Sequence, residues 1–518
     1  MRGQNFVWRA LDRARAMNLA EAGEAPAVPG SDGLSRRRVL AGLAGLGGAA
    51  LLPRWPAFAQ SPPRVAIVGG GLAGLAALDT LRRRGVEALL YEARAAAGGR
   101  TRSVRGVFAT DFAFDEGAQL VNSDHSDLLG LVSRFGLSLV DRRAFGDSHE
   151  IQIGRNGRAV READLARRLR GIAARITADS NRLDRDHDTV AAEIDALSVK
   201  DYLDRHGLRA GDARDALEAS IRTEYGVEPD QASALELVFN LPTVDGRRLS
   251  RISASDERYL ISGGTDQVAR ALAAEHQPYL RLGRKLVALD LSRAPVRLAF
   301  ADGSEAVADR VILALPVSML AGLRIDGPLP PLWRAAFEEV RLGRNEKLIV
   351  GYDAQPWRRR PGFGGAVWAS RDFSAIWDAA SLAPVGAGPG ALCYFLGGAQ
   401  VEAAANASTA ELAARFTAAA RRVLPGLPAP NGRIRRTRWS DDPLTRGAYV
   451  NFRPGQLTRF EPLLTVEEEG QARPSEAGPL LFAGEWLSDA WPGYMNGAVQ
   501  TGRIAAEAAL AQAAALAA

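Results

Sequence analysis

The sequence of 518 residues contains a single cysteine, Cys393. An internal disulfide therefore cannot form, and a zinc or iron–sulfur site built from several cysteines is excluded. Histidine is also scarce, because the chain has only five, and their positions lack the spacing that metal-ligand motifs use. We therefore expect no metal centre in this protein.

A strong charge imbalance is also missing. The net charge of +5 comes mostly from residues 1–59, where eight basic and four acidic residues give +4, which leaves about +1 for the rest. The basic balance is thus no argument for nucleic-acid binding, and no nucleic-acid partner is expected. The composition, 47% hydrophobic and 24% charged, is typical of a globular protein of two or three domains, at roughly 100–200 residues per domain.

Residues 1–59 contain the pattern of an export signal. The tetrapeptide Ser-Arg-Arg-Arg at 35–38 precedes an apolar run at 39–52, and 57–59 reads Ala-Phe-Ala, with small residues where a signal peptidase cuts. The run is too short for a bilayer, which needs about 20 apolar residues. The pattern resembles a bacterial twin-arginine signal, so we predict that 1–59 is a signal peptide and that the protein is periplasmic. The alternative is a chance basic N-terminus before a surface helix. An internal start is also open, because 34 residues before the tetrapeptide is long for a signal; no later stretch is expected to span a membrane.

A glycine-rich turn after this segment has the features of a dinucleotide site. An apolar run at 64–68 predicts a buried strand, and Gly69, Gly71 and Gly74 follow it, before leucines at helical spacing. A second strand then ends at Glu92, 18 positions (92 − 74) after the last glycine. In such a unit the first glycine makes the tight turn, the second lets the backbone approach a pyrophosphate, and the third lets helix and strand pack closely, while the acidic residue binds a ribose. The pattern predicts dinucleotide binding; the alternative is a glycine-rich turn without a nucleotide.

Two further turns favour a flavin over a nicotinamide. Gly99 and Arg100 follow the acidic residue closely, where the backbone can approach a large ligand and an arginine can offset phosphate charge. Near the other end of the sequence a predicted strand runs into Gly484 and Glu485 and is followed by the start of a helix. This distant element suits a second approach to the same cofactor, which FAD domains often use and nicotinamide domains do not need. We therefore predict FAD.

With these motifs in place, the chain resembles the FAD-dependent amine oxidase family, which includes monoamine, polyamine and L-amino-acid oxidases and bacterial relatives. The resemblance covers roughly residues 64–515. It rests on the glycine fingerprint with Glu92, Gly98-Gly99-Arg100-Thr101, Asp115-Glu116-Gly117-Ala118, Gly263-Gly264, the run at 309–316, Gly484-Glu485, and Gly493-Tyr494-Met495.

The family resemblance implies an α/β fold in which a Rossmann-like FAD-binding domain is interleaved with an α+β substrate domain that has a mixed sheet. The implied FAD-binding segments are 62–125, 255–322 and 440–515, and the implied substrate-binding segments are 126–254 and 323–439. No motif is recognised in 126–255. The sequence leaves the oligomeric state open, with a homodimer as one candidate.

The resemblance also implies roles for individual cofactor-binding residues. Val287 matches the residue whose backbone contacts the adenine, Glu485 matches the one at the ribityl or pyrophosphate region, and Met495 matches the one whose N–H meets the flavin pyrimidine edge. In monoamine oxidases a cysteine that carries the flavin covalently precedes a tyrosine, and here that position is Ala448. Since Cys393 lies in a strand-like run elsewhere, the resemblance implies noncovalent FAD.

Three residues are implied to lie nearest the chemistry. Lys347 enters an apolar strand and matches the family lysine that holds a water at the flavin; the alternative is an edge-strand lysine that points to solvent. Tyr449 and Tyr494 match two tyrosines that enclose the substrate amine between their π faces; the alternative is two packed core tyrosines. These three are the candidate catalytic residues.

The implied reaction is the oxidation of a small-molecule amine. A hydride passes from the α carbon to FAD, the imine is hydrolysed to an aldehyde or ketone, and O2 reoxidises the flavin to give H2O2. One alternative is an L-amino-acid oxidase, which needs a cation for the substrate carboxylate, with Arg102, Arg222 and Arg251 as candidates. Another is an FAD-dependent amine dehydrogenase or desaturase that passes electrons to a cytochrome or quinone.

Overall fold

A computed structural model provides the fold. The structure describes residues 6–24, 64–108, 113–142, 151–239, 243–245, 248–250, 256–359, 366–379, 388–468 and 470–517. The twin-arginine pattern at 35–59 lies outside the described residues. Of the helices that are described, none has the length and apolar character needed to cross a membrane.

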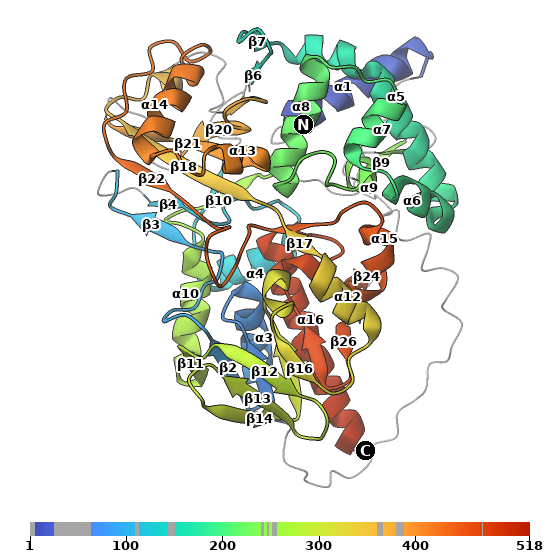
Figure 1. The fold of residues 1–518 in the computed structure, drawn as a ribbon, viewed down its shortest axis with the longest axis vertical. Coiled ribbons are helices and arrows are strands. Elements are labelled where there is room, and N and C mark those ends of the chain that lie inside the picture. Colours follow the sequence, from blue (N-terminus) through green and yellow to red (C-terminus); the bar gives the residue numbers. More distant parts are fainter. Residues whose placement is uncertain are drawn as a thin grey trace.

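The lower lobe in Figure 1 is built on a six-stranded sheet. Its strand order is β11 (Leu280–Leu282), β2 (Ala88–Glu92), β1 (Val65–Val68), β15 (Arg310–Leu313), β27 (Leu480–Phe482) and β26 (Ser475–Ala477). The first five strands are parallel, and β26 is antiparallel to β27. Because strands from the beginning, middle and end of the sequence alternate in it, this lobe is assembled from distant segments, and the predicted α/β class is confirmed.

Alternate side chains of β1 enter two different cores, as the period of a strand requires. Val65 and Ile67 pack in a cluster with helices α3 (Leu72–Arg83) and α16 (Met495–Ala517). Ala66 and Val68 pack in the cluster on the opposite face. The central strand is therefore buried on both sides, as a parallel strand in an α/β sheet should be.

A smaller sheet and one helix cover that opposite face. The smaller sheet has the order β14 (Glu305–Ala308), β13 (Val296–Phe300), β12 (Leu286–Asp290) and β16 (Arg324–Asp326). Helix α12 (Pro331–Glu339) packs on the lobe through Trp333, whose ring is stacked on Phe482 with centroids 3.9 Å apart. The lower lobe thus has three layers, with the six-stranded sheet in the middle (Figure 1).

The upper lobe contains a mixed seven-stranded sheet (Figure 1). Its order is β22 (Ile434–Arg436), β18 (Asn345–Tyr352), β21 (Gly390–Gly397), β20 (Ala375–Asp378), β19 (Ala366–Trp368), β6 (Ile151–Ile153) and β7 (Ala159–Val160). All described pairs are antiparallel except β19 with β6. Helix α14 (Thr409–Ala420), which begins with a capping box at Ser408, buries its apolar side in the core on this sheet.

A group of helices completes the upper lobe. It comprises α1 (Phe6–Glu21), α5 (Glu162–Arg185), α6 (His187–Asp195), α7 (Val199–Arg205), α8 (Asp212–Tyr225) and α9 (Ala234–Phe239). Leu165, Leu169, Ile172 and Ile176 recur at helical spacing on α5, and all four are fully or almost fully buried. Helix α1 lies beside α5 and α8 in Figure 1, although it falls within the segment that the sequence assigns to an export signal.

Short elements connect these layers. They are β3 (Ser103–Arg105), β4 (Ala113–Asp115), α4 (Ser126–Arg134), β5 (Leu139–Asp141), β8 (Thr243–Asp245), β9 (Arg248–Ser250), β10 (Tyr259–Ile261), α10 (Asp266–Glu275), η2 (Gln277–Tyr279), α11 (Val317–Leu320), β17 (Arg341–Leu342), η3 (Pro356–Arg359), α13 (Ala399–Ala403), β23 (Val450–Asn451), α15 (Gln456–Phe460), η4 (Glu461–Leu463), β24 (Val466–Glu468), β25 (Gln471–Arg473) and η5 (Glu485–Leu487).

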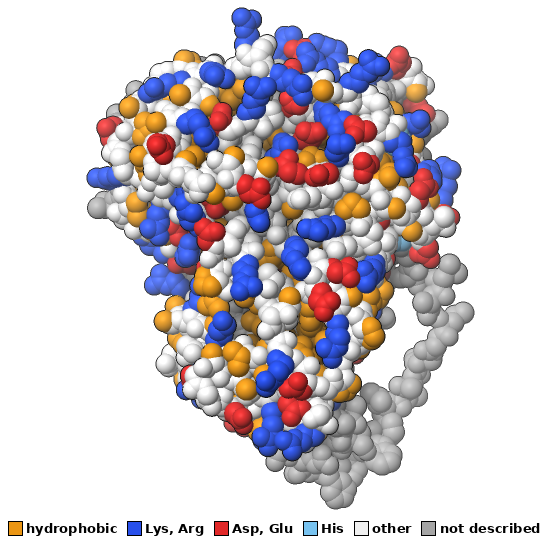
Figure 2. Space-filling model, in the orientation of Figure 1, with side chains coloured by type: hydrophobic (Ala, Val, Ile, Leu, Met, Phe, Trp, Pro, Cys, Tyr) orange, Lys and Arg blue, Asp and Glu red, His pale blue; other side chains and the backbone are white. Residues whose placement is uncertain are grey.

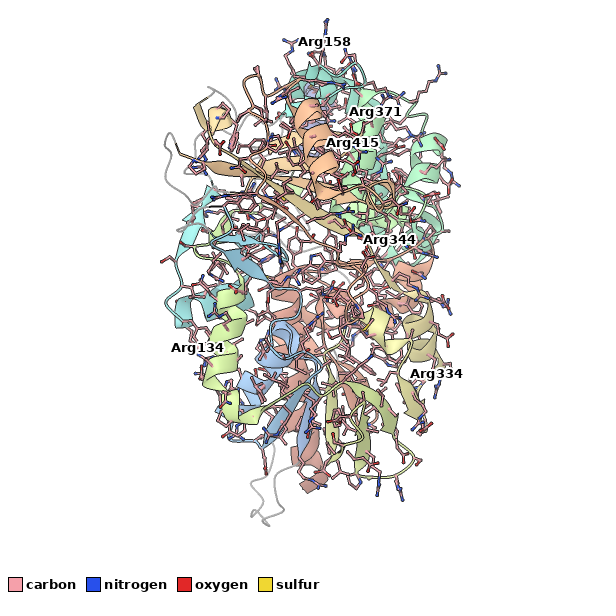
Figure 3. The ribbon with its side chains drawn as sticks, turned by 60° about the vertical axis from the view of Figure 1, so that its left-hand side comes forward. Arg134, Arg158, Arg334, Arg344, Arg371 and Arg415 are labelled. Atoms are coloured by element: carbon pink, nitrogen blue, oxygen red, sulfur yellow. The ribbon has the colours of Figure 1, made fainter. Side chains whose placement is uncertain are left out.

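Basic and acidic side chains are interspersed over the face shown in Figure 2. Arg134, Arg344 and Arg415, labelled in Figure 3, each form an ion pair, with Asp79, Glu402 and Asp372 respectively. Such pairs at a protein surface contribute little stability individually, about 0–1 kcal/mol. These three arginines are therefore compensated by nearby carboxylates.

Candidate active site

A cavity of about 1060 Å³ is lined by residues of both lobes. The lower lobe contributes the glycine turn that links β1 to α3, and the upper lobe contributes residues of α8, β18 and β20. The predicted site residues that line it are Gly69, Gly71, Glu92, Gly99, Arg100, Val287, Lys347, Tyr449, Gly484, Glu485, Tyr494 and Met495. Residues predicted separately from distant parts of the sequence therefore share one cavity.

The three fingerprint glycines occupy different environments. A Cβ on Gly69 would lie 2.3 Å from the Ala314 carbonyl oxygen, and one on Gly74 would lie 1.9 Å from the Gly69 oxygen. These two positions therefore need glycine for packing, and Gly74 is not among the residues that line the cavity. A Cβ on Gly71 would meet nothing within 4 Å, so this residue presents its backbone to open space in the cavity.

The acidic residue at the end of β2 is held in a fixed position. Glu92 is buried, and its two carboxylate oxygens accept hydrogen bonds from the Gly70 N–H at 2.6 Å and the Arg94 N–H at 2.7 Å. Val287 lies where the register between β12 and β13 shifts, so it is the extra residue of a bulge. A bulged backbone outside the regular ladder is available to a ligand, which agrees with the implied adenine contact.

The two distant turns are joined by an ion pair. Arg100 Nη1 lies 2.7 Å from Glu485 Oε1, and the same nitrogen donates to the Ala448 carbonyl oxygen at 2.6 Å. The other Glu485 oxygen accepts from the Gly493 N–H at 3.0 Å. Glu485 thus connects the segment after β2 with the loop before α16, and the turns lie close enough to bind one molecule.

These features fit FAD. The open face of Gly71 leaves room for a pyrophosphate beside the N-terminus of α3, where free N–H groups and the helix dipole favour an anion. Met495 begins α16 and lines the same cavity, so a second helix N-terminus can serve the opposite end of the cofactor. Ala448 also lines the cavity, whereas Cys393 is buried in β21 and is not among the lining residues. The described residues therefore offer no thiol for a covalent flavin link.

Lys347 is buried in an internal strand of the seven-stranded sheet. Its Nζ donates to the Asp115 and Gly117 carbonyl oxygens at 2.8 and 2.7 Å and to Gln119 Oε1 at 3.2 Å. Burial lowers the pKa of the ammonium. The alternative of an edge-strand lysine that points to solvent is wrong, because β18 is paired on both sides and the side chain is 6% exposed.

The two candidate tyrosines approach the cavity from neighbouring loops. Tyr449 donates from its hydroxyl to the Thr223 carbonyl oxygen, and burial, followed by the charge of Glu224, raises its pKa well above the ordinary value. Tyr494 lies in the loop before α16, next to Gly493, where an added Cβ would lie 3.7 Å from the Tyr449 Cβ. Both rings line the cavity.

His125 is a neighbour of this pair that the sequence did not single out. Its ring centroid lies 5.1 Å from that of Tyr494, edge to face, with an angle of 64° between the rings. Nδ1 accepts a hydrogen bond from the Asn122 N–H, so a neutral ring carries its proton on Nε2, which is buried without a hydrogen-bond partner. No spacing rule could have identified His125 as a neighbour of the site, because the ring that it contacts belongs to a residue 369 positions (494 − 125) away.

This environment predicts a pH effect on stability. Burial lowers the pKa of His125 from 6.5 to about 3. The unfolded chain therefore takes up a proton below pH 6.5 that the folded protein does not bind, so stability falls as the pH falls from 6.5 towards 3. In His125→Gln this contribution disappears, and the loss in unfolding free energy between pH 7 and pH 5 should be smaller by about 2 kcal/mol. Chemical denaturation at pH 7 and pH 5 measures the unfolding free energy of each protein, with His187→Gln as the control. If wild type and His125→Gln lose the same stability between these pH values, a neutral buried His125 is refuted.

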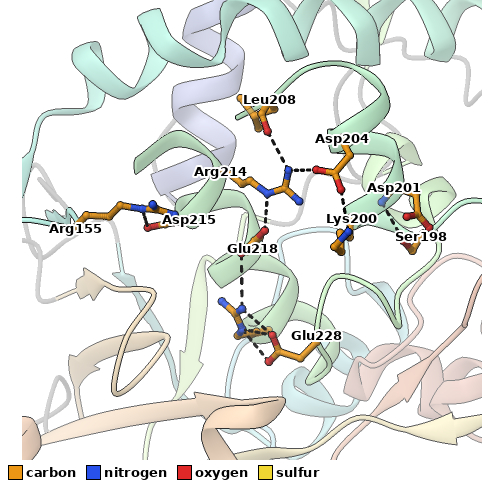
Figure 4. Close-up of polar contacts among 11 residues, drawn as sticks. Arg155, Ser198, Lys200, Asp201, Asp204, Leu208, Arg214, Asp215, Glu218 and Glu228 are labelled. Carbon is orange, nitrogen blue, oxygen red and sulfur yellow. Dashed lines mark hydrogen bonds and ion pairs between the residues drawn. The ribbon is translucent and has the colours of Figure 1, made fainter. Parts of the chain in front are cut away.

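The candidate carboxylate-binding arginines lie elsewhere. Arg222 of α8 pairs at 2.7 Å with Glu228, which is labelled among the polar contacts around α7 and α8 in Figure 4. Arg102 pairs with Glu116 at 2.6 Å and its guanidinium lies over the Trp439 ring. Neither arginine is among the described residues that line the cavity, and Arg251 lies outside the described residues.

Comparison with known proteins agrees with this geometry. Residues 72–510 match a family model described as flavin containing amine oxidoreductase. A Mycobacterium tuberculosis protein, AofH, which carries the name of a flavin-containing monoamine oxidase, is 27% identical over 478 residues, covering 86% of this chain and 96% of its own. A Pseudomonas protein named pseudooxynicotine dehydrogenase is 24% identical over 508 residues, covering 91% and 95%. A solved putrescine oxidase bound to putrescine has a TM-score of 0.73 and 22% identity, covering 87% of this chain and 99% of its own.

The family match spans most of the two lobes and of the cavity between them. FAD is the cofactor, and its binding is noncovalent, in agreement with alanine at position 448. Flavin-dependent oxidation of an amine is the class of reaction that the family carries out. The chain belongs to the family of flavin-containing amine oxidoreductases.

Proposed function

We propose that the protein is an amine oxidase that oxidises a small-molecule amine at the carbon next to nitrogen and passes the electrons to O2, with H2O2 as a product. The observation that carries this proposal is the presence of Tyr449, Tyr494 and Lys347 in the cavity that also contains the open face of Gly71. A dinucleotide site alone would need neither the tyrosines nor a buried lysine. Their position next to it supports a catalytic cavity for amines.

The protein's own residues bind, orient and desolvate the amine. FAD supplies the two-electron acceptor when it is bound. Tyr449 and Tyr494 exclude water from the neutral amine and place its nitrogen against their π faces. The Lys347 ammonium lies among three oxygen acceptors, of which the Gln119 oxygen at 3.2 Å is the most distant. A water held beside this ammonium would assist either the reduction of O2 or the hydrolysis of the imine product.

Tyr494→Ala should reduce amine turnover while FAD stays bound. The tyrosine hydroxyl is not required for a π-face contact, so Tyr494→Phe should retain most of the activity. We expect kcat/KM to fall by roughly 10- to 100-fold in the alanine variant, as for the loss of an important positioning contact. Steady-state kinetics with the flavin content measured by absorbance checks it, and unchanged turnover in Tyr494→Ala would remove this residue from the site.

A dehydrogenase is the second candidate, because the relative covering 91% of this chain is named pseudooxynicotine dehydrogenase. Such an enzyme would pass electrons to a cytochrome or quinone instead of O2. An L-amino-acid oxidase has less support, since neither Arg102 nor Arg222 is among the described cavity-lining residues and each is already paired with a carboxylate, Glu116 and Glu228 respectively.

One experiment distinguishes these functions. The purified protein is mixed with benzylamine, putrescine or phenylalanine, and flavin bleaching under nitrogen and peroxide release in air are both recorded. Bleaching and peroxide with either amine would support the oxidase. Bleaching without peroxide would indicate the dehydrogenase, a response to phenylalanine alone would indicate the amino-acid oxidase, and no bleaching with any of the three would refute oxidation of these substrates.

We further propose export to the periplasm by the twin-arginine route, on the basis of the sequence at 35–59. Replacing Arg36, Arg37 and Arg38 with lysine should leave the protein in the cytoplasm. Cell fractionation measures this, and an unchanged distribution between the two compartments would contradict the proposal.

A further inference from the structure

Helix α1 packs as an integral part of the upper lobe. Phe6, Val7 and Leu11 are at most 1% exposed, and they belong to the same apolar cluster as the buried side of α5. A helix packed only by chance on a finished surface would not complete a core in this way. The first described residues of the chain therefore complete the apolar core around α5.

Polar contacts fix the register of α1 on α5. Arg9 Nε lies 3.1 Å from Glu162, and Arg15 Nε donates to Thr177 Oγ1 at 3.0 Å. At the end of the helix, Asn18 and Arg170 bond in both directions: Asn18 Nδ2 donates to the Arg170 carbonyl oxygen at 2.9 Å, and Arg170 Nε donates to Asn18 Oδ1 at 2.7 Å. Contacts at the start, middle and end of the helix define a single docked position.

This docked position brings Trp8 to the cavity. Trp8 is partly buried, packs against the cluster that contains Tyr225, Trp368 and Phe395, and lines the same cavity as these three residues. Helix α1 lies in the upper lobe, whereas the glycine turn lies in the lower lobe (Figure 1). Because Trp8 lines the same cavity as Tyr449 and Tyr494, the tail of an amine whose nitrogen lies between the two tyrosines can extend towards Trp8.

We propose that α1 is the outer wall of the amine-binding cavity and that Trp8 determines the preference for long apolar amines. This inference rests on the proposed function for its substrate. It also means that the working enzyme retains residues 6–21, either in one chain or as a bound peptide, although the predicted signal peptide would remove them. In that case the twin-arginine pattern would lie between two parts of the folded enzyme rather than before it.

The first test is a series of primary alkylamines from butylamine to decylamine. Trp8→Ala should raise the KM of the longest amines by roughly 10-fold, with kcat little changed, and should leave the KM of butylamine unchanged. Trp8→Phe should restore most of the affinity, and Arg13→Ala, at an exposed position of the same helix, is the matched control. A KM change that is equal for all chain lengths, or no change, would overturn the role of Trp8.

The second test is independent of substrate. Intact-mass analysis of the active, flavin-loaded protein from its native host should give either the whole chain or a shortened chain together with a bound peptide that contains 6–21. Full activity in a protein that begins near residue 60, with no second peptide, would overturn the proposal. If the wild type oxidises no amine, the proposed function fails, while the mass of the flavin-loaded protein still decides whether α1 is retained.

Discussion

Gly71→Val should give a folded protein that is purified without colour. The residue has an extended backbone with φ −76° and ψ −177°, and a Cβ there meets nothing within 4 Å, so valine fits the apo fold. The added branches would occupy the space that a pyrophosphate needs. We expect flavin affinity to fall at least about 100-fold and amine oxidation to be lost with it.

The measurement is the ratio of FAD absorbance to protein, together with circular dichroism to establish the fold. FAD released into the supernatant after denaturation of the wild type gives the reference content. Gly130→Val is the matched control, because Gly130 on α4 also has nothing within 4 Å of an added Cβ and is not among the cavity-lining residues. A yellow Gly71→Val protein with full FAD content would contradict the assignment of the fingerprint.

Lys347→Met should slow turnover by roughly 100-fold, as the removal of a preorganised charge from a water-excluded site often does. Reduction of the flavin by an amine under nitrogen should change much less, because the tyrosines that hold the amine are untouched. The variant should also be less stable, since three oxygen acceptors lose their shared donor. Stopped-flow measurement of the reductive and oxidative steps separates these effects.

Lys200→Met is the control for removal of a lysine charge, because this lysine lies on the surface and pairs only with an exposed neighbour, Asp204, in the described contacts. Equal rates of reoxidation by O2 in wild type and Lys347→Met would remove the lysine from the oxidative step. A loss confined to flavin reduction would assign it instead to amine binding.

The sequence could predict the parts of the fold whose signals are local. The expected strand at 64–68 is observed as Val65–Val68, and the helix after the glycine turn is observed as Leu72–Arg83. These two predictions are correct because apolar periodicity and glycine spacing specify the strand and the helix within one short segment. Arg100 and Glu485 are likewise predicted from the sequence as separate candidates, and the structure adds the ion pair between them.

Other features depend on contacts that no single segment encodes. The acceptors of Lys347 come from the segment 115–119, and an isolated lysine in an apolar strand does not reveal them. The segment 126–255 carries no recognisable motif, because its helices α5 to α9 are specified by an apolar periodicity that many proteins share. The sequence likewise does not predict Trp8 as a cavity residue, because its position follows from the docking of α1 on α5.

The interleaved strand order of the lower lobe also limits when the enzyme can mature during synthesis. Strand β15 pairs with β1 on one side and with β27 on the other, and α16 follows β27 in the chain. The chain must therefore have left the ribosome as far as β27 and α16 before the last parallel strand and the second helix over the sheet can be added. FAD capture is thus expected only after these elements have been synthesised, and nascent chains that stall before residue 480 should remain without the cofactor.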